Sequence, residues 1–132
     1  MRRAGPASPD TARLMAEWPD GERPAWVSGH RPLDGTVLPA VQAGAFDIDT
    51  LRRAWGAQGC RRVWLVGGGD VAAQFSRAGA IDRIVLSTVP VTLGRGIPLF
   101  AQGIDGLAGF IDAQAVRQWP NGLTQRVLQR RV

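Results

Sequence analysis

Three consecutive glycines, Gly67–Gly69, separate an apolar run from a helix-like segment in the stretch LVGGGDVAAQF (65–75). Glycine loses more backbone entropy on ordering than any other residue, so a triplet predicts either a tight turn or a ligand lying against bare backbone. The first turn of a helix leaves N–H groups unbonded and carries partial positive charge, which suits a phosphate group. In this strand-to-helix setting we expect phosphate binding.

The residues after the glycines restrict which phosphate ligand is expected. Gly67, Gly69 and Ala72 satisfy the loose dinucleotide pattern G-x-G-x-x-A. The usual dinucleotide fold also requires an acidic residue about 20 positions on, at the end of the next strand. The next strand of this sequence ends in STVP, without an acidic residue, and Asp82 lies at its start instead. A standard doubly wound dinucleotide-binding domain is therefore not expected. No Gly-Lys-Ser/Thr follows the glycines, so a P-loop is excluded as well.

Other catalytic chemistries lack the residues they need. One histidine, His30, and one cysteine, Cys60, do not build a usual zinc site, so no metal is expected. No G-x-S-x-G nucleophile motif occurs. The five tryptophans are spread along the elements and are expected in the core or at its rim. We identify no catalytic acid, because four aspartates are best explained as turn, cap or solvated residues: Asp34, Asp47, Asp49 and Asp82.

Length and composition predict one soluble domain over residues 9–132, after a disordered N-terminus over residues 1–8. The 132 residues are 45% hydrophobic and 20% charged, without an apolar run long enough to span a bilayer. The single cysteine excludes an internal disulfide, which suits a reducing cytoplasm. We therefore expect a cytoplasmic protein that does not bind membranes.

The net charge of +5 comes from arginine, because the chain has no lysine. The arginines are scattered in pairs, such as Arg52/Arg53 and Arg61/Arg62, whereas nucleic-acid binders usually show a clustered basic patch. We expect no nucleic-acid partner, and a small anionic molecule remains compatible with the surplus.

The hydrophobic pattern predicts an α/β fold with a parallel core and an antiparallel C-terminal hairpin. Asp47 or Asp49 is expected to cap the second helix, with Leu51 and Trp55 on its apolar face. The expected helices are 8–18, 46–59 and 70–79, and the expected strands are 25–28, 36–39, the buried 61–67, 82–91, 108–119 and 123–130.

Residues 63–100, VWLVGGGDVAAQFSRAGAIDRIVLSTVPVTLGRGIPLF, resemble the signature of the dihydrofolate-reductase-like family. More narrowly, they resemble the reductase domain of the bifunctional riboflavin-biosynthesis deaminase–reductase. The segments MAEWPDGERPAWVS (15–28) and VRQWPNGLTQRVLQR (116–130) are similar to flanking parts of that domain. The resemblance extends from about position 11 to the C-terminus.

The resemblance implies an NADPH-dependent reductase that transfers a hydride to a pyrimidine- or pteridine-like small molecule. In the riboflavin pathway that substrate is 5-amino-6-(5-phosphoribosylamino)uracil. Arg95, in the loop PVTLGRGIP, is a candidate contact for an anionic substrate. The resemblance places the cofactor's pyrophosphate on Gly67, Gly68, Gly69, Asp70 and Val71, and its adenosine 2′-phosphate on Ser28, His30 and Arg31. A hydroxyl and a guanidinium beside a turn suit such a phosphate.

Members of the family begin with a strand like SLDGYIA, a substrate-side loop and helix, and a second strand with a Gly-Arg turn. This sequence begins near the following helix, so we expect a truncated fold that lacks the central strand. Its sheet would then expose two edges and an apolar slot, with dimerisation through a sheet edge or the C-terminal hairpin. The alternatives are a truncated, non-catalytic domain of the same fold that binds a nucleotide or dimerises, and an anion-binding module without redox chemistry.

Overall fold

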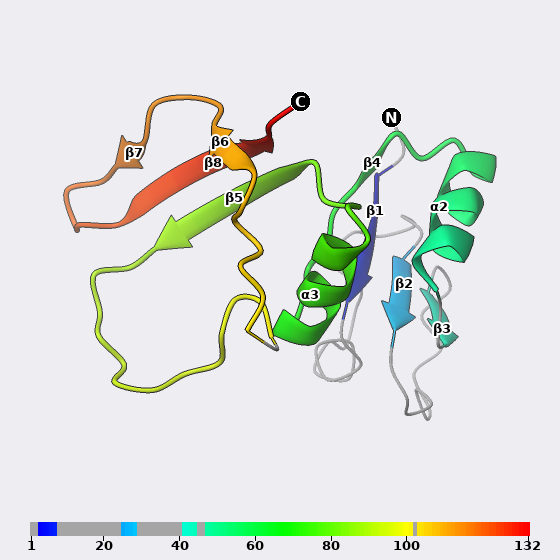
Figure 1. The fold of residues 1–132 in the computed structure, drawn as a ribbon, viewed down its shortest axis with the longest axis horizontal. Coiled ribbons are helices and arrows are strands. Elements are labelled where there is room, and N and C mark those ends of the chain that lie inside the picture. The colour runs from blue at the N-terminus through cyan, green and yellow to red at the C-terminus, as the bar shows by residue number, and fades with distance from the viewer. Residues whose placement is uncertain (1–2, 8–24, 29–40, 45–46, 102) are drawn as a thin grey trace.

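The computed structural model describes residues 3–7, 25–28, 41–44, 47–101 and 103–132, and shows an α/β fold built around two sheets (Figure 1). One sheet is parallel and is covered by helices, whereas the other is antiparallel and contains the C-terminal strands. Within the described ranges, no helix is long and apolar enough to cross a membrane.

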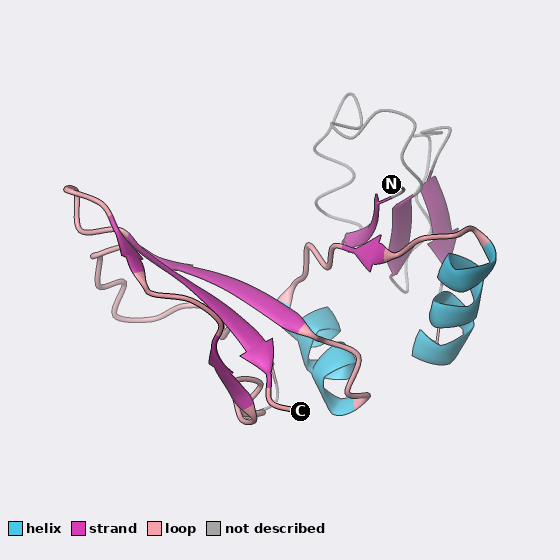
Figure 2. Ribbon diagram, turned by 90° about the horizontal axis from the view of Figure 1, so that it is seen from above, coloured by secondary structure: helices cyan, strands magenta, loops and turns pink. Residues whose placement is uncertain are grey.

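The parallel sheet has the strand order β3-β2-β1-β4. Its neighbours β1 and β2, β2 and β3, and β1 and β4 are all parallel, so the carboxyl ends of the four strands lie at one edge. Figure 2 shows helices α2 and α3 on the same side of this sheet. The bounds are β1 Arg3–Ala7, β2 Ala25–Ser28, β3 Val41–Gly44, α2 Ile48–Ala57, β4 Arg62–Val63 and α3 Gly69–Arg77.

An aromatic core lies between the helices and the parallel sheet. Trp26 of β2, Leu51 and Trp55 of α2, and Phe75 of α3 are all buried. Trp55 meets Trp26 edge-on, with ring centroids 5.9 Å apart, and stacks on Phe75 at 6.1 Å. Leu51 and Trp55 are four residues apart, so they share one face of α2 as the sequence predicted. Offset and edge-to-face ring pairs add stabilisation beyond the area they bury.

The antiparallel sheet has the order β5-β8-β6, with β7 also pairing with β8. Its bounds are β5 Arg83–Thr88, β6 Phe110–Asp112, β7 Arg117–Gln118 and β8 Thr124–Arg130. The PNG segment turns β7 into β8, with Gly122 at a φ of 83° and the Leu123 N–H donating to Asn121 Oδ1. Leu128 is buried, and Phe110 lies under the Arg130 guanidinium at 4.9 Å.

The bounds of α2 and α3 lie within two residues of the predicted ones, and three other predictions need correction. One is the single strand expected over 108–119, which is two strands, β6 and β7. Asp47 caps α2, and Gly59 and Gly79 adopt positive φ just beyond the two helices. Residues 1–8 were expected to be disordered, but Arg3–Ala7 form the strand β1 between β2 and β4. The segment 61–67 was expected to be a buried strand, but β4 spans Arg62–Val63 alone, and Trp64 and Val66 are exposed. The predicted helix 8–18 and strand 36–39 lie outside the described residues.

The strand–helix–strand unit β4–α3–β5 also differs from the expected single sheet. Among the described strands, β4 pairs with β1 and belongs to the parallel sheet, while β5 pairs with β8. Helix α3 therefore connects two sheets, and it lies between them in both Figure 1 and Figure 2. The glycine turn precedes α3 and so lies where the two sheets are joined.

Candidate functional site

The three glycines of the turn do not share one role. Gly67 and Gly68 adopt φ values of 96° and 89°, which an L-residue with a side chain rarely adopts. A Cβ at either position would meet nothing within 4 Å. These two residues present bare backbone to open space, as close approach by a ligand requires.

Gly69 has an ordinary φ, but another segment of the chain lies against it. A Cβ at Gly69 would come within 2.6 Å of the Pro98 carbonyl oxygen. The Ala101 N–H donates to the Gly69 carbonyl at 3.0 Å. Position 69 therefore requires glycine because the 98–101 segment packs directly on it. This contact holds the glycine turn in place.

Helix α3 begins at this turn without a side-chain cap. Gly68 is the N-cap residue, and its carbonyl accepts from Ala72 N–H at 3.0 Å. The N–H groups of Gly69, Asp70 and Val71 therefore precede the first intrahelical bond of α3. Their partial charge suits an anion. Asp70 lies in the first turn with an exposed carboxylate, which stabilises the free helix end and would repel an anion placed there.

The proposed 2′-phosphate residues fall at the same edge of the parallel sheet, as far as the structure describes them. Ser28 is the last residue of β2, and the glycine turn follows β4. Strand β1 lies between β2 and β4, so two strand spacings, or about 10 Å, separate β2 from β4. His30 and Arg31 lie outside the described residues.

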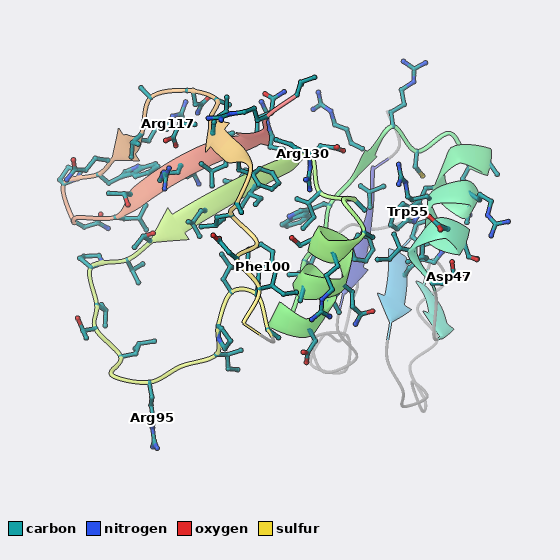
Figure 3. The ribbon with its side chains drawn as sticks, viewed as in Figure 1. Asp47, Trp55, Arg95, Phe100, Arg117 and Arg130 are labelled. Atoms are coloured by element: carbon teal, nitrogen blue, oxygen red, sulfur yellow. The ribbon has the colours of Figure 1, made fainter. Side chains whose placement is uncertain are left out.

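The loop between β5 and β6 carries the remaining candidate, Arg95. Figure 3 shows Arg95 at the outer end of this loop, with its side chain directed away from both sheets. The loop exposes apolar side chains on both sides of Arg95, up to 92% for Ile97. These exposed apolar residues are Val89, Val91, Leu93, Ile97 and Leu99.

The sequence did not reveal how this loop is anchored. Phe100 is buried, and its ring lies directly against Gly106, where no Cβ fits. Together with the Ala101–Gly69 hydrogen bond, this contact fixes the end of the loop beside the glycine turn. Pro90, Pro98 and the two glycines between them indicate a loop, but such composition does not indicate what the loop contacts.

The four aspartates that the sequence analysis explained as turn, cap or solvated residues differ in their surroundings. Asp47 accepts hydrogen bonds from the Thr50 N–H at 2.8 Å and from the Thr50 hydroxyl at 2.5 Å. The bond from the hydroxyl contributes most to lowering the pKa of Asp47, and the bond from the backbone N–H lowers it further. Asp49 is exposed in the first turn of α2, and Asp82 is exposed just before β5. Asp34 lies outside the described residues. Asp47, Asp49 and Asp82 do not belong to the glycine turn, in contrast to Asp70.

One ion pair, which the sequence analysis did not single out, joins β6 to β8. Arg126 Nε and Nη2 donate to Asp112 Oδ1 and Oδ2 at 2.9 and 2.8 Å. These hydrogen bonds lower the pKa of Asp112 and raise that of Arg126. The pair ties the antiparallel sheet together and is not part of the glycine turn.

Cys60, Trp26 and Trp55 lie where the sequence predicted, whereas Trp64 does not belong to the core. Cys60 is half-buried at the edge of the aromatic core, and Trp26 and Trp55 form its centre. Trp64, which follows β4, and Trp119, which follows β7, are exposed, and Trp18 lies outside the described residues. The Trp55 indole N–H is buried and has no hydrogen-bond partner among the described residues.

Comparison with known proteins identifies both the sequence family and the fold. The family model of the RibD C-terminal domain matches residues 7–118. A 38-residue stretch is 42% identical to the uncharacterized protein YwjB of Bacillus subtilis (strain 168), covering 29% of this chain and 22% of that protein. The chain therefore matches less than a quarter of the length of this curated relative.

Two solved structures share the fold at low sequence identity. A putative riboflavin biosynthesis protein from Shewanella sp. PV-4 superposes with a TM-score of 0.79 at 19% identity, over 98% of this chain and 74% of that one. RibD from Acinetobacter baumannii superposes with a TM-score of 0.66 at 15% identity, over 98% of this chain and 46% of that one. Both likenesses extend over the two sheets together.

Proposed function

Because the chain belongs to the family of RibD C-terminal domains, we propose that it is an NADPH-binding reductase of the riboflavin-biosynthesis type. Its substrate is a pyrimidine- or pteridine-like small molecule, with 5-amino-6-(5-phosphoribosylamino)uracil as the first to test. The proposed site of action is the cytoplasm. Similarity to a riboflavin biosynthesis protein and to a RibD protein supports this assignment.

The observation that carries the proposal is the open backbone of Gly67 and Gly68 at the N-terminus of α3. In the proposal, this turn and the N–H groups of Gly69, Asp70 and Val71 bind the cofactor's pyrophosphate. The donor set fits that group, because unbonded N–H groups and a helix dipole both favour a phosphate anion. A side chain at Gly68 would occupy the space that the phosphates need.

The second part of the proposed site is the carboxyl end of β2. Ser28 ends that strand, which lies two strand positions from β4, the strand that precedes the glycine turn. The Ser28 hydroxyl, His30 and the Arg31 guanidinium are proposed to bind the adenosine 2′-phosphate. A guanidinium binds such a dianion with two parallel hydrogen bonds, so NADPH should be preferred over NADH.

When bound, NADPH supplies the hydride for reduction. The residues of the chain then serve to place the cofactor. Gly69, held by Pro98 and Ala101, fixes the turn against the end of the β5–β6 loop, which limits how far the pyrophosphate can shift. Arg95 at the tip of that loop is the proposed contact for an anionic substrate.

The separation of β4 from β5 favours a second function, nucleotide binding without turnover. Hydride transfer requires nicotinamide and substrate in near-attack geometry, within a few tenths of an ångström. The two strands that flank α3 belong to different sheets, and no described strand lies between them to position the nicotinamide. The alternative is a domain of the same fold that binds the nucleotide or dimerises.

Thermal denaturation with each cofactor tests binding first. A ligand at about 100 times its Kd stabilises the folded state by about 2.7 kcal/mol, which raises the Tm by several degrees. We expect NADPH to raise the Tm and NADH to raise it much less. No shift with either cofactor at millimolar concentration would exclude the proposed site.

The variant Gly68→Asp tests the location of the site, and Gly94→Asp is its matched control. Both glycines have positive φ and open space at Cβ, so the backbone strain is comparable, but Gly94 lies in the β5–β6 loop. We expect G68D to abolish the NADPH shift and G94D to retain it. Consumption of NADPH with the uracil substrate then separates the reductase from the non-catalytic alternative.

A further inference from the structure

A segment distant in the sequence contacts one peptide unit of the glycine turn. The Ala101 N–H donates to the Gly69 carbonyl oxygen at 3.0 Å. That carbonyl and the Asp70 N–H belong to the same planar peptide unit and point in opposite directions. The Asp70 N–H precedes the first intrahelical bond of α3, from Ala72 to Gly68, so it is one of the free donors of the helix end. The contact with Ala101 therefore acts on a donor of the proposed pyrophosphate site.

Hydrogen bonds in series strengthen one another, because each bond polarises the groups of the next. The Ala101 N–H draws electron density toward the Gly69 oxygen, which makes the Asp70 N–H a better donor to an anion. In the reverse direction, an anion bound to the Asp70 N–H makes the Gly69 oxygen a stronger acceptor for Ala101. Because coupling between two binding events is reciprocal, anion binding and docking of Ala101 favour each other by the same factor.

Phe100 holds Ala101 in this position. Residues 89–99 are exposed, and Phe100 is the first buried residue after them. The Phe100 ring lies so close to Gly106 that a Cβ there would overlap the ring atoms. Gly106 is itself buried in the turn directly before β6. Phe100 therefore fixes the 98–101 segment to the antiparallel sheet at the point where Ala101 reaches the glycine turn.

The rest of the β5–β6 loop adds little to this attachment. Within residues 89–100, the described structure has one backbone hydrogen bond, from the Val91 N–H to the Val89 carbonyl at 2.8 Å. Segments with exposed backbone and few buried contacts open locally at low free-energy cost. Docking of the 98–101 segment on Gly69 is therefore an equilibrium that a ligand at the turn can shift.

We infer that Phe100 is a positioning residue for the cofactor, because it holds the Ala101 N–H on the peptide unit whose Asp70 N–H binds the pyrophosphate. This inference rests on the proposed function, since it concerns the same glycine turn. The turn binds pyrophosphate tightly while the 98–101 segment is docked and more weakly when the segment is displaced. Bound NADPH in return tightens the docking of the segment.

The variant Gly106→Ala tests the inference, with Gly96→Ala as its matched control. Neither glycine has a positive φ. The new methyl group collides with the Phe100 ring at position 106, whereas at position 96 its nearest neighbour is the Leu93 Cδ1 at 4.0 Å. We expect G106A to weaken NADPH binding by about fivefold or more, as is usual for coupled sites, and G96A to leave the Kd unchanged. Calorimetric titration of the folded variants measures both. An equal Kd in G106A and G96A would overturn the inference.

Adenosine 2′-monophosphate separates positioning of the turn from general damage to the fold. This probe carries the 2′-phosphate but no pyrophosphate, so it should bind G106A and the unsubstituted chain equally. Equal weakening of NADPH and of this probe in G106A would contradict the role of Phe100, because the loss would then come from the fold as a whole.

Hydrogen exchange of the unsubstituted chain tests the reverse direction. Saturating NADPH should slow exchange of the Ala101 amide by about fivefold or more. The Gly122 amide, which donates to the Trp119 carbonyl in the turn between β7 and β8, should be unaffected. If NADPH binds without slowing Ala101, the inference is wrong and the proposed function stands. If the unsubstituted chain shows no saturable NADPH binding, both are wrong. If G106A does not fold, the Ala101 measurement decides alone.

Discussion

The two sheets of this protein are stabilised in different ways. The parallel sheet is short-stranded and is held by an aromatic core under two helices, in which Trp26, Leu51 and Trp55 are nearly inaccessible to solvent. The antiparallel sheet pairs β5 with β8 over six consecutive residues, and Leu128 is its buried residue in the part of the chain that the structure describes. The first depends on packing and the second on its hydrogen-bonded ladder, and the glycine turn lies where they are joined.

Removing a core ring should have the largest effect. Trp55→Ala deletes a buried side chain that contacts Trp26 and Phe75, and such changes cost about 3–5 kcal/mol of unfolding free energy. Trp64→Ala, on an exposed tryptophan, should cost less than about 1 kcal/mol. Urea denaturation of the two variants measures the difference. Equal losses would mean that the aromatic cluster is not what stabilises the parallel sheet.

The contact between the turn and the β5–β6 loop should show an intermediate effect. In Gly69→Ala, the new methyl group collides with the Pro98 carbonyl, so the 98–101 segment must move and the Ala101 amide should exchange faster. In Gly67→Ala, the positive φ at position 67 costs about 1–2 kcal/mol of backbone strain, but the new methyl group does not contact the 98–101 segment. Hydrogen exchange at Ala101 distinguishes the two variants. Equal protection in both would show that the loop does not depend on Gly69.

The smallest expected effect is the pH dependence of the Asp112–Arg126 pair in the antiparallel sheet. The folded chain lowers the pKa of Asp112 through the Arg126 hydrogen bonds, so this pair stabilises the fold above the ordinary aspartate pKa of about 3.9. That contribution is lost as the pH falls through the lowered pKa.

Asp112→Asn should therefore flatten the acid limb of the stability curve, as followed by urea denaturation at several pH values. Asp47→Asn is a useful contrast in the helical region, because asparagine also caps a helix and should preserve the Thr50 contact in part. An unchanged acid limb in D112N would mean that the pair contributes nothing to acid stability.

The sequence predicted the elements that depend on local patterns. Helix α2 was predicted from the capping residue Asp47 and from the apolar residues Leu51 and Trp55 that follow it. Gly59 and Gly79 indicated where α2 and α3 end. The PNG turn and the strand after it were also predicted, although the residues of that last strand do not alternate cleanly and its boundary was not defined. These signals lie within a few residues of the structure they specify, so no knowledge of the remaining fold was needed.

The features that depend on distant segments were not predictable. Pairing of Arg3–Ala7 with β2 and β4 leaves no periodic signal in five residues containing a glycine and a proline. The exposure of Trp64 and Val66 could not be read from an apolar run, because such a run indicates burial when a neighbour is present. The role of Gly69 depends on Pro98, which is 29 positions away in the sequence.

In the candidate site, too, the locally encoded part was predictable from the sequence and the part that depends on distant contacts was not. The glycine turn was evident from the sequence because phosphate binding needs glycines at one helix start, and the structure separates two open glycines from one that is packed. How Arg95 and the β5–β6 loop lie relative to the turn depended on the Phe100 contact with Gly106, which no local pattern indicates.

The most direct test of the account is an NMR titration of the backbone amides with NADPH. The proposed site predicts the largest, saturable shifts at Gly67, Gly68, Gly69, Asp70 and Val71, with smaller shifts at Ser28 and little change along β8. Shifts confined to the antiparallel sheet, or an absence of saturable shifts at the glycine turn, would contradict the account.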